Sequence, residues 1–288
     1  MELTFDLGDL TLKAKAWGNS NNPPILGIHG WLDNANTFDS IAPLISKDKY
    51  FIAIDIAGHG LSDHRPENSS YFLWDYAKDL LGVIDILGWE KISILAHSMG
   101  TGIASIMAGA MPELVDKLIF VDGLGAPFVL EDSNVVDNFR KSIKQRKMAK
   151  KTKLYGFSSI DVPQFATKEE AIKDRMKSNF GNISYRSSAS LIERSLQKIS
   201  NGYRWRYDAR IALPEIYKMT EHQAQLFIDK ISSEVLILLG EQGLFAEGLF
   251  HKRLQRFKKK QLHWLPGGHH LHLEEQHEEI AVLINQFL

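Results

Sequence analysis

Short apolar runs alternate with helical patterns along the first half of the chain, and the apolar runs return near its end. The segments 3–7 and 10–17 are typical of the two strands of a hairpin, with Gly8 and Asp9 in the turn. Other runs are apolar almost throughout and predict buried strands, which are contained in residues 24–30, 50–60, 91–98, 116–123, 234–243 and 261–270. Continuous apolar strands of this kind are typical of a parallel sheet that is covered on both faces.

Three segments between and after these strands show helical spacing. Apolar residues recur with a helical period over 73–87, and a second helix is predicted over 37–46. The terminal segment 274–288 opens with acidic residues and closes with apolar ones, as expected for a helix that docks on the sheet. Strands that alternate with helices indicate an α/β protein.

The alternation stops between about residues 123 and 231, where no strong buried strand is evident. This segment holds 20 Lys and Arg against 12 Asp and Glu, whereas the rest of the chain is acidic. We therefore predict a core domain formed by 1–122 and 232–288, with 123–231 inserted as a helical cap. The basic run 140–153 is interpreted as a solvated helix face or as a guide for anionic substrates or lipid head groups.

Composition excludes several classes of protein. A net charge of −1 over 288 residues gives no argument for binding nucleic acid, and the absence of Cys excludes disulfides and thiolate chemistry. The opening "MELTFDLGDL" lacks the basic region of a secretion signal, and no apolar run approaches the roughly 18 residues of a membrane helix. We expect a cytoplasmic protein without stable membrane insertion, and the oligomeric state stays open.

The stretch "LAHSMG" (95–100) carries the strongest chemical signal. A nucleophile elbow is a sharp turn from strand to helix, and it needs small residues two positions before and two after the nucleophile. Ala96 and Gly100 meet this need around Ser98, although the usual pattern has Gly at the first position. Ser98 is therefore a candidate nucleophile, and a serine that merely caps a core helix is the alternative.

A general base for Ser98 is expected in "LPGGHHLHLEEQ" (265–276), which follows a predicted strand. His269, His270 and His272 all lie in this segment. A loop at the carboxyl end of a strand can reach a serine on a neighbouring strand of the same sheet. We predict no metal site, because the sequence places no carboxylate set at convincing spacing near these histidines.

An acyl transfer also needs N–H donors for the developing oxyanion. One donor is expected to be the backbone N–H of Met99, directly after the nucleophile, and the other that of Trp31. His29 and Gly30 shape the bend that leads to Trp31.

Several motifs together resemble the α/β-hydrolase superfamily. They occur in the family's order and cover the whole core: "HGWLDNANTFD" (29–39), "DIAGHGLSD" (55–63), "LAHSMG" (95–100), "LLGEQG" (238–243) and "GGHHLHLEE" (267–275). Within the superfamily, "HGWLDNANTFDSIAPLI" and "YRWRYDARI" resemble the serine hydrolase-like proteins. The resemblance implies a mostly parallel sheet of about eight strands with helices on both faces and an inserted helical cap. It aligns His269 with the catalytic histidine and His272 with a second, structural one.

The third triad member departs from the family's usual pattern. The family most often places its acid after the strand "VLILLG", where this chain has Gly243. Some members carry the acid after the preceding strand instead, which points to Asp122. Glu241 is the alternative, two residues before Gly243.

The sequence therefore predicts a serine hydrolase that cleaves a carboxylic ester through Ser98, His269 and Asp122, with a small-molecule substrate and no cofactor. Thioester, amide or carbon–carbon bond hydrolysis and a non-catalytic binding protein are the alternatives. The residues expected to touch substrate are His29, Gly30, Asp33, His97 and Phe128. Cap aromatics (Tyr155, Phe157, Phe165, Phe180, Tyr203, Trp205) could also line the pocket, and the arginines of 203–210 could bind an anion or form salt bridges.

Overall fold

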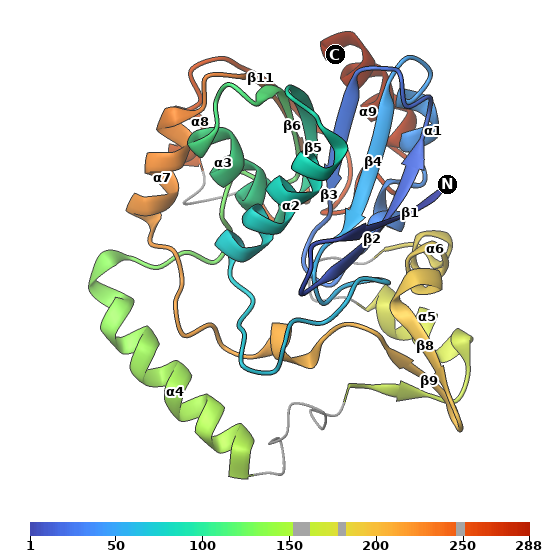
Figure 1. The fold of residues 1–288 in the computed structure, drawn as a ribbon, viewed down its shortest axis with the longest axis vertical. Helices are drawn as coiled ribbons and strands as arrows, with labels where there is room; N and C mark the ends of the chain where they lie inside the picture. The colour runs from blue at the N-terminus through green and yellow to red at the C-terminus, as the bar shows by residue number, and fades with distance from the viewer. Residues whose placement is uncertain (152–161, 178–182, 246–250) are drawn as a thin grey trace.

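A mixed, mostly parallel sheet organises the fold, as seen in a computed structural model that describes residues 1–151, 162–177, 183–245 and 251–288 (Figure 1). Its eight strands lie in the order β1-β2-β4-β3-β5-β6-β10-β11, and only the pairs β1–β2 and β2–β4 are antiparallel. The strands are β1 Glu2–Asp6, β2 Thr11–Trp17, β3 Pro24–Ile28, β4 Tyr50–Asp55, β5 Ile92–His97, β6 Val115–Val121, β10 Glu234–Gly240 and β11 Lys260–Leu265. The predicted α/β fold, the hairpin and the buried strands are confirmed.

Helices cover both faces of this sheet. One face carries α2 (Leu73–Leu87) and α3 (Gly100–Ala110), and the other carries α1 (Ala42–Ile45) and α9 (His277–Phe287) (Figure 1). Two separate hydrophobic clusters fill the space between the sheet and these two helical layers. Every residue of β4 and β5 is buried, as expected for central strands that face helices on both sides.

The predicted helix over 37–46 is interrupted. The structure has a 3₁₀ turn, η1 Ala35–Phe38, followed by the single turn α1. Pro43 lies in the first turn of α1 and has no backbone N–H, so a continuous helix through 39 would lose a hydrogen bond there. The predicted helix over 73–87 is observed with the same bounds.

The inserted segment contains strands as well as helices. Its helices are α4 Val135–Lys151, α5 Lys168–Met176, α6 Tyr185–Ser195 and α7 Glu221–Lys230, with the 3₁₀ turns η2 Asp132–Asn134 and η3 Ala209–Ala212. Three short antiparallel strands form a second sheet in the order β7-β9-β8, from Gln164–Phe165, Gly202–Trp205 and Leu196–Ile199. Strands of two to four residues are too short to show the alternation that sequence patterns depend on.

The parts of the insertion lie in different places. The sheet β7-β9-β8, α5 and α6 gather beside one end of the main sheet (Figure 1), whereas α4 packs against the segment 214–216, where Ser142 donates to the carbonyl oxygen of Glu215. Helix α7 lies beside α3, and Ala224 and Ile228 of α7 belong to the main hydrophobic cluster. The short helix α8 (His251–Leu254) follows β10. No helix in the described residues is long and apolar enough to span a bilayer.

A buried ion pair joins the predicted cap to the predicted core. Arg194 of α6 contacts Asp55 at the end of β4, with 2.8 Å between Nη2 and Oδ2. The Asp55 carboxylate also accepts hydrogen bonds from the backbone N–H groups of Ala35 and Leu61. Both charged side chains are buried, with Asp55 0% and Arg194 5% exposed.

We expect Arg194→Met to lower the free energy of unfolding by about 3–5 kcal/mol, because it leaves the Asp55 carboxylate buried without its cation. Urea unfolding followed by circular dichroism measures the change. Lys168→Met is the matched control, since Lys168 pairs with Glu193 where both side chains are about half exposed, and its loss should stay below about 1 kcal/mol. Equal losses in the two variants would contradict the assignment of Arg194 as a structural anchor.

Candidate active site

Ser98 lies on a strained turn between β5 and α3. Its φ of +50° places a non-glycine residue in the left-handed region, which is uncommon and costs energy unless the surroundings hold it. The backbone is crowded here: a Cβ on Gly100 would come 2.3 Å from the carbonyl oxygen of Ile28, and one on Gly30 would come 3.1 Å from Cβ of Ser98. Ala96 is fully buried and paired with Ile28 and Phe120. The single methyl group of alanine therefore fits where the usual pattern has glycine.

His269 and Asp122 meet at the same edge of the sheet. Asp122 follows β6 and His269 lies in the loop after β11, and His269 Nδ1 is 2.5 Å from Asp122 Oδ2. A carboxylate can only accept, so Nδ1 carries the proton and Nε2 presents a lone pair. The structure thus brings together the predicted base and the predicted acid.

Backbone N–H groups fix the Asp122 carboxylate. Oδ1 accepts from Gly240 at 3.2 Å, and Oδ2 accepts from Leu244 at 3.0 Å. Gly240 is the last residue of β10, and Leu244 lies in the loop that follows it. The side chain of Asp122 is fully buried, and its own φ is +38°.

The position of Asp122 gives a steric reason for the glycine at 243. A Cβ built on Gly243 would lie 2.2 Å from Oδ1 of Asp122. Any side chain at 243 would therefore collide with the carboxylate that β6 supplies. Glu241, the alternative acid, is exposed, and its backbone N–H bonds to Leu265.

Burial dominates the electrostatics of His269. Removal from water lowers the pKa of His269 below its usual value, while the hydrogen bond to Asp122 opposes this shift. The imidazole is therefore mainly neutral near pH 7, which is the form a general base requires.

The predicted oxyanion residues lie on either side of Ser98. Met99 directly precedes the first residue of α3, where the helix dipole favours negative charge. Trp31 follows Gly30, and Gly30 approaches Ser98 closely. Both residues are thus close to the elbow, and their role as oxyanion donors stays a prediction.

Ser98 and His269 open onto a cavity of about 400 Å³. Four of the five residues predicted to touch substrate line this cavity: Gly30, Asp33, His97 and Phe128. A second cavity of about 350 Å³ shares Trp31 and Phe128 with the first and is also lined by Met99. The two cavities thus adjoin at the elbow.

His29 has a different place from the one expected. It lines neither of these two cavities and is fully buried. Its Nε2 accepts from the backbone N–H of Ile56 at 3.1 Å, and Nδ1 lies 2.7 Å from the carbonyl oxygen of Gly30. Burial lowers the pKa of His29 to about 4, so the neutral ring holds the loop after β3 instead of facing substrate.

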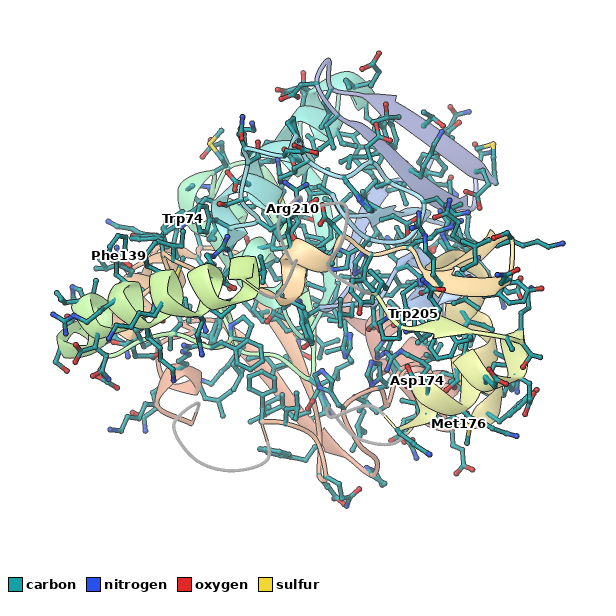
Figure 2. All side chains as sticks on the ribbon, turned by 90° about the horizontal axis from the view of Figure 1, so that it is seen from below. Trp74, Phe139, Asp174, Met176, Trp205 and Arg210 are labelled. Carbon is teal, nitrogen blue, oxygen red and sulfur yellow. The ribbon has the colours of Figure 1, made fainter. Side chains whose placement is uncertain are left out.

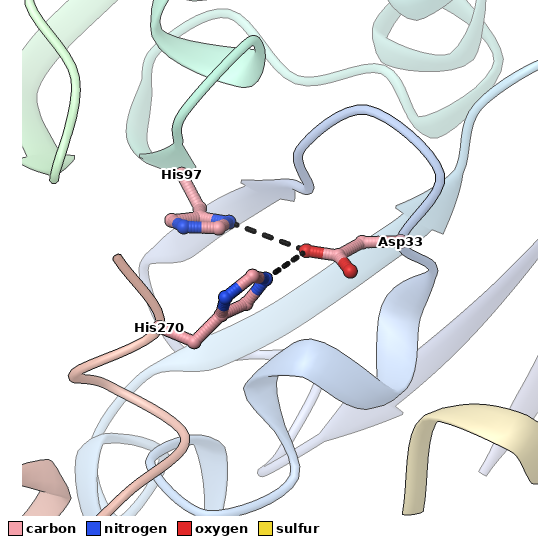
Figure 3. Close-up of side chains that lie close together, drawn as sticks. All are labelled: Asp33, His97 and His270. Carbon is pink, nitrogen blue, oxygen red and sulfur yellow. Dashed lines mark hydrogen bonds and ion pairs between the residues drawn. The ribbon is translucent and has the colours of Figure 1, made fainter. Parts of the chain in front are cut away.

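Asp33 lies beside His97 and His270 (Figure 3), and Arg175 also contacts it. Oδ2 is 3.2 Å from Nε2 of His270 and 3.4 Å from Nδ1 of His97, while Oδ1 accepts from Nη2 of Arg175 at 2.6 Å. Asp33, His97 and His270 are the only group in the described residues with the spacing of metal ligands. The sequence had suggested no carboxylate near the histidines, because Asp33 lies more than 200 positions away.

His272 fits the expected structural role. It is fully buried, and its Nε2 lies 2.9 Å from Oγ1 of Thr37. Burial lowers its pKa well below the usual value. This contact ties the histidine loop to the segment after β3.

Several cavity-lining residues of the cap were not predicted as site residues. They include Arg175 and Asp174 of α5, Lys177 and Tyr207, next to Trp205, which was among the candidate aromatics. In Figure 2, Asp174 and Trp205 lie close together in the cap. A charged helix such as α5 looks like a solvated surface in sequence, so no local signal singles out these side chains.

The other aromatic and arginine residues that were expected in the cap contact protein groups in most cases. Phe165 and Tyr203 pack against a small cap cluster that contains Trp205, whereas Tyr155, Phe157 and Phe180 lie outside the described residues. Arg210 forms a salt bridge with Asp208, as one of the two interpretations of 203–210 expects, whereas Arg204 donates to the amide oxygen of Gln197.

Comparisons with known proteins agree with this geometry. A family model described as the alpha/beta hydrolase fold matches residues 23–276. A serine hydrolase-like protein of Dictyostelium discoideum is 33% identical over 95% of this chain and 77% of its own length, and one of Danio rerio is 30% identical over 96% and 85%. The crystal structure of a hypothetical protein from Pseudomonas aeruginosa PAO1 superposes with a TM-score of 0.91, at 36% identity over 99% of this chain and 98% of that one. The chain therefore belongs to the α/β-hydrolase fold family and is similar to the serine hydrolase-like proteins within it.

Proposed function

We propose that this chain is a serine hydrolase that cleaves a carboxylic ester, with Ser98, His269 and Asp122 as its triad. The observation that carries the proposal is the combination of a serine on a strained elbow with a histidine in the same cavity whose Nδ1 donates to a buried carboxylate. This is the arrangement that a Ser-His-Asp mechanism requires, independent of sequence order.

The reaction proceeds in two halves. Ser98 Oγ attacks the ester carbonyl carbon while Nε2 of His269 takes the hydroxyl proton. The backbone N–H groups of Trp31 and Met99 stabilise the oxyanion. When the carbon–oxygen bond to the alcohol breaks, His269 returns the proton to the leaving oxygen, and an acyl-enzyme remains. Water then attacks the acyl carbon, gives its proton to His269, and the acid leaves as Ser98 Oγ is protonated.

Asp122 orients His269 and stabilises the imidazolium that forms in each half. No step of this sequence requires a cofactor. The segment 123–231 acts as a cap that limits water access, since Phe128, Trp205 and Tyr207 line the cavity beside Ser98.

The two adjoining cavities support a division of the substrate. The second cavity is bounded mainly by apolar side chains, among them Trp74, Leu213 and Met219. The first also contains the charged groups of Asp174, Arg175 and Lys177. We assign the apolar cavity to the acyl chain and the polar cavity to the alcohol side of a small-molecule ester.

Ser98→Ala should lower kcat for p-nitrophenyl esters by at least about a thousand-fold, because only binding and oxyanion stabilisation remain. A fluorophosphonate probe should label the wild-type protein and not this variant, as read by mass spectrometry. Ser105→Ala is the matched control, since Ser105 lies on the same helix and bonds to the carbonyl oxygen of Thr101. If the probe does not label the wild-type protein, the proposal that Ser98 is a nucleophile is wrong. If the protein hydrolysed thioesters or amides but no esters, the proposed substrate class would be wrong, whereas the proposed triad would stand.

Asp122→Asn should lower kcat by roughly 10³–10⁴-fold, whereas Glu241→Gln should leave it nearly unchanged. The pH profile gives a second measurement. Activity requires neutral His269, so kcat/KM should fall as the pH drops through a pKa below the usual 6.5. Because Asp122 raises that pKa, its removal should move the acidic limb to still lower pH. If only the Glu241→Gln variant lost activity, the assignment of Asp122 as the triad acid would be wrong.

A carboxylate introduced at position 243 should be able to replace the one at position 122, provided that both are not present together. Gly243→Asp alone should reduce activity, since its Cβ collides with Asp122. Asp122→Gly removes the collision and suits the positive φ at that position. Adding Gly243→Asp to Asp122→Gly should therefore raise kcat by at least about tenfold over Asp122→Gly alone. If the double variant is folded, as judged by circular dichroism, and its kcat is no higher than that of Asp122→Gly, side chains at 122 and 243 do not supply the carboxylate from the same space.

A further inference from the structure

Three potential metal ligands converge beside the cavity from three separate loops. Asp33 follows β3, His97 ends β5, and His270 follows β11 (Figure 3). Asp33 is 2%, His97 0% and His270 4% exposed. All three nevertheless line the cavity that contains Ser98, so an ion in the cavity could reach them.

Nδ1 of His97 faces the Asp33 carboxylate in a buried place. Nε2 of the same ring lies 3.0 Å from the carbonyl oxygen of His269, and a carbonyl only accepts, so Nε2 donates this hydrogen bond. Nδ1 is therefore the ring atom that is left to bind an ion. It lies 3.4 Å from Asp33 Oδ2 and has no hydrogen-bond partner within the described part of the chain. A metal ion between these two buried atoms would bind both of them.

The spacing fits a metal ion. In a tetrahedral site with bonds of about 2.0–2.1 Å, ligand atoms lie roughly 3.3 Å apart. Asp33 Oδ2 lies 3.4 Å from Nδ1 of His97 and 3.2 Å from Nε2 of His270, and all three ligand atoms lie within 4.8 Å of one another. The bond from His97 Nε2 to a backbone carbonyl is the outer contact that metal-binding histidines usually make.

The donor set indicates the class of ion. Two imidazoles and one carboxylate suit Zn²⁺ and its neighbours Co²⁺ and Ni²⁺, and not the hard cations that prefer oxygen alone.

Arg175 opposes a cation at this position. Its Nη2 is 2.6 Å from Asp33 Oδ1 and 3.4 Å from His270 Nε2. At Asp33 the guanidinium contacts Oδ1 and leaves Oδ2 for the ion, whereas its longer contact with His270 Nε2 falls on a ligand atom and would be given up when the ion binds. Its charge nevertheless weakens cation binding, and its removal should therefore strengthen it.

We propose that Asp33, His97 and His270 form a binding site for a divalent transition-metal ion of the Zn²⁺ class, with a fourth coordination position open to the cavity. Bound metal inhibits the enzyme, because the ring of His97 lies 4.6 Å from that of His269 and a nearby cation disfavours the imidazolium that catalysis forms. This consequence rests on the proposed function, whereas metal binding does not.

Calorimetry with Zn²⁺ and visible absorption with Co²⁺ test binding directly, on chelator-treated full-length protein without a histidine tag at neutral pH. We expect one equivalent to bind and the Co²⁺ spectrum to be that of a four-coordinate ion. Asp33→Asn and His270→Gln should each weaken binding by about a hundred-fold or more. His222→Gln, at an exposed position on α7, should leave binding unchanged.

Arg175→Met keeps the proposal testable if the ligand variants fail to fold. It should tighten Zn²⁺ binding by about tenfold, since it removes the competing charge and none of the ligands. Zn²⁺ should also shift the ¹⁵N resonance of His97 Nδ1 in histidine-labelled protein. Absence of stoichiometric binding, or an Arg175→Met affinity no higher than that of wild type, would overturn the proposal. A ¹⁵N resonance of His97 Nδ1 that does not move when Zn²⁺ is added would overturn it as well. Metal binding without loss of esterase activity would contradict the proposed inhibition and leave the metal site in place. The proposed function is tested separately, by measuring activity in the absence of metal.

Discussion

The carboxylate of Asp122 connects the segments that form the site. It follows β6, accepts hydrogen bonds from Gly240 at the end of β10 and from Leu244 in the next loop, and receives the N–H of His269 from the loop after β11. One buried anion therefore sets the position of the histidine relative to the elbow on β5. Because an ionised carboxylate is costly to bury without donors, these loops are constrained to keep their N–H groups directed at it.

Asp33 also joins segments from different parts of the chain, as Asp122 does. It contacts the residue before Ser98, the residue after His269 and Arg175 of α5. The elbow, the histidine loop and the cap thus share one buried carboxylate. The two acids differ in their donors, because Asp122 is held by backbone N–H groups and Asp33 by ionisable side chains. A site held by side chains can exchange a proton for a metal ion, and a site held by backbone amides cannot.

Buried ion pairs and apolar contacts both join the predicted cap to the rest of the molecule. Arg194 contacts Asp55, and Arg175 contacts Asp33. Ala224 and Ile228 of α7 belong to the main hydrophobic cluster, whereas the cluster around Trp205 is small and lies within the insertion. The ion pairs are shielded from water, so their loss would leave buried charges without partners.

The parts of the fold that follow from local patterns could be predicted from the sequence. The continuous apolar runs correctly predicted the core strands, and the helical period predicted α2. The helix over 37–46 was wrong because Pro43 breaks it, and the strands β7–β9 are too short to leave a pattern. The triad assignment and the division into core and cap stay predictions.

The sequence by itself determined the fold family, the elbow around Ser98 and the two candidate acids, because these depend on apolar periodicity and on short motifs. Only the tertiary structure decided which carboxylate lies against His269. That choice depends on free space, since the Asp122 side chain fills the volume into which a side chain at 243 would project. The meeting of Asp33 with His97 and His270 was likewise invisible in sequence. It arises because parallel strands bring their carboxyl ends to one edge of the sheet, however far apart they lie along the chain.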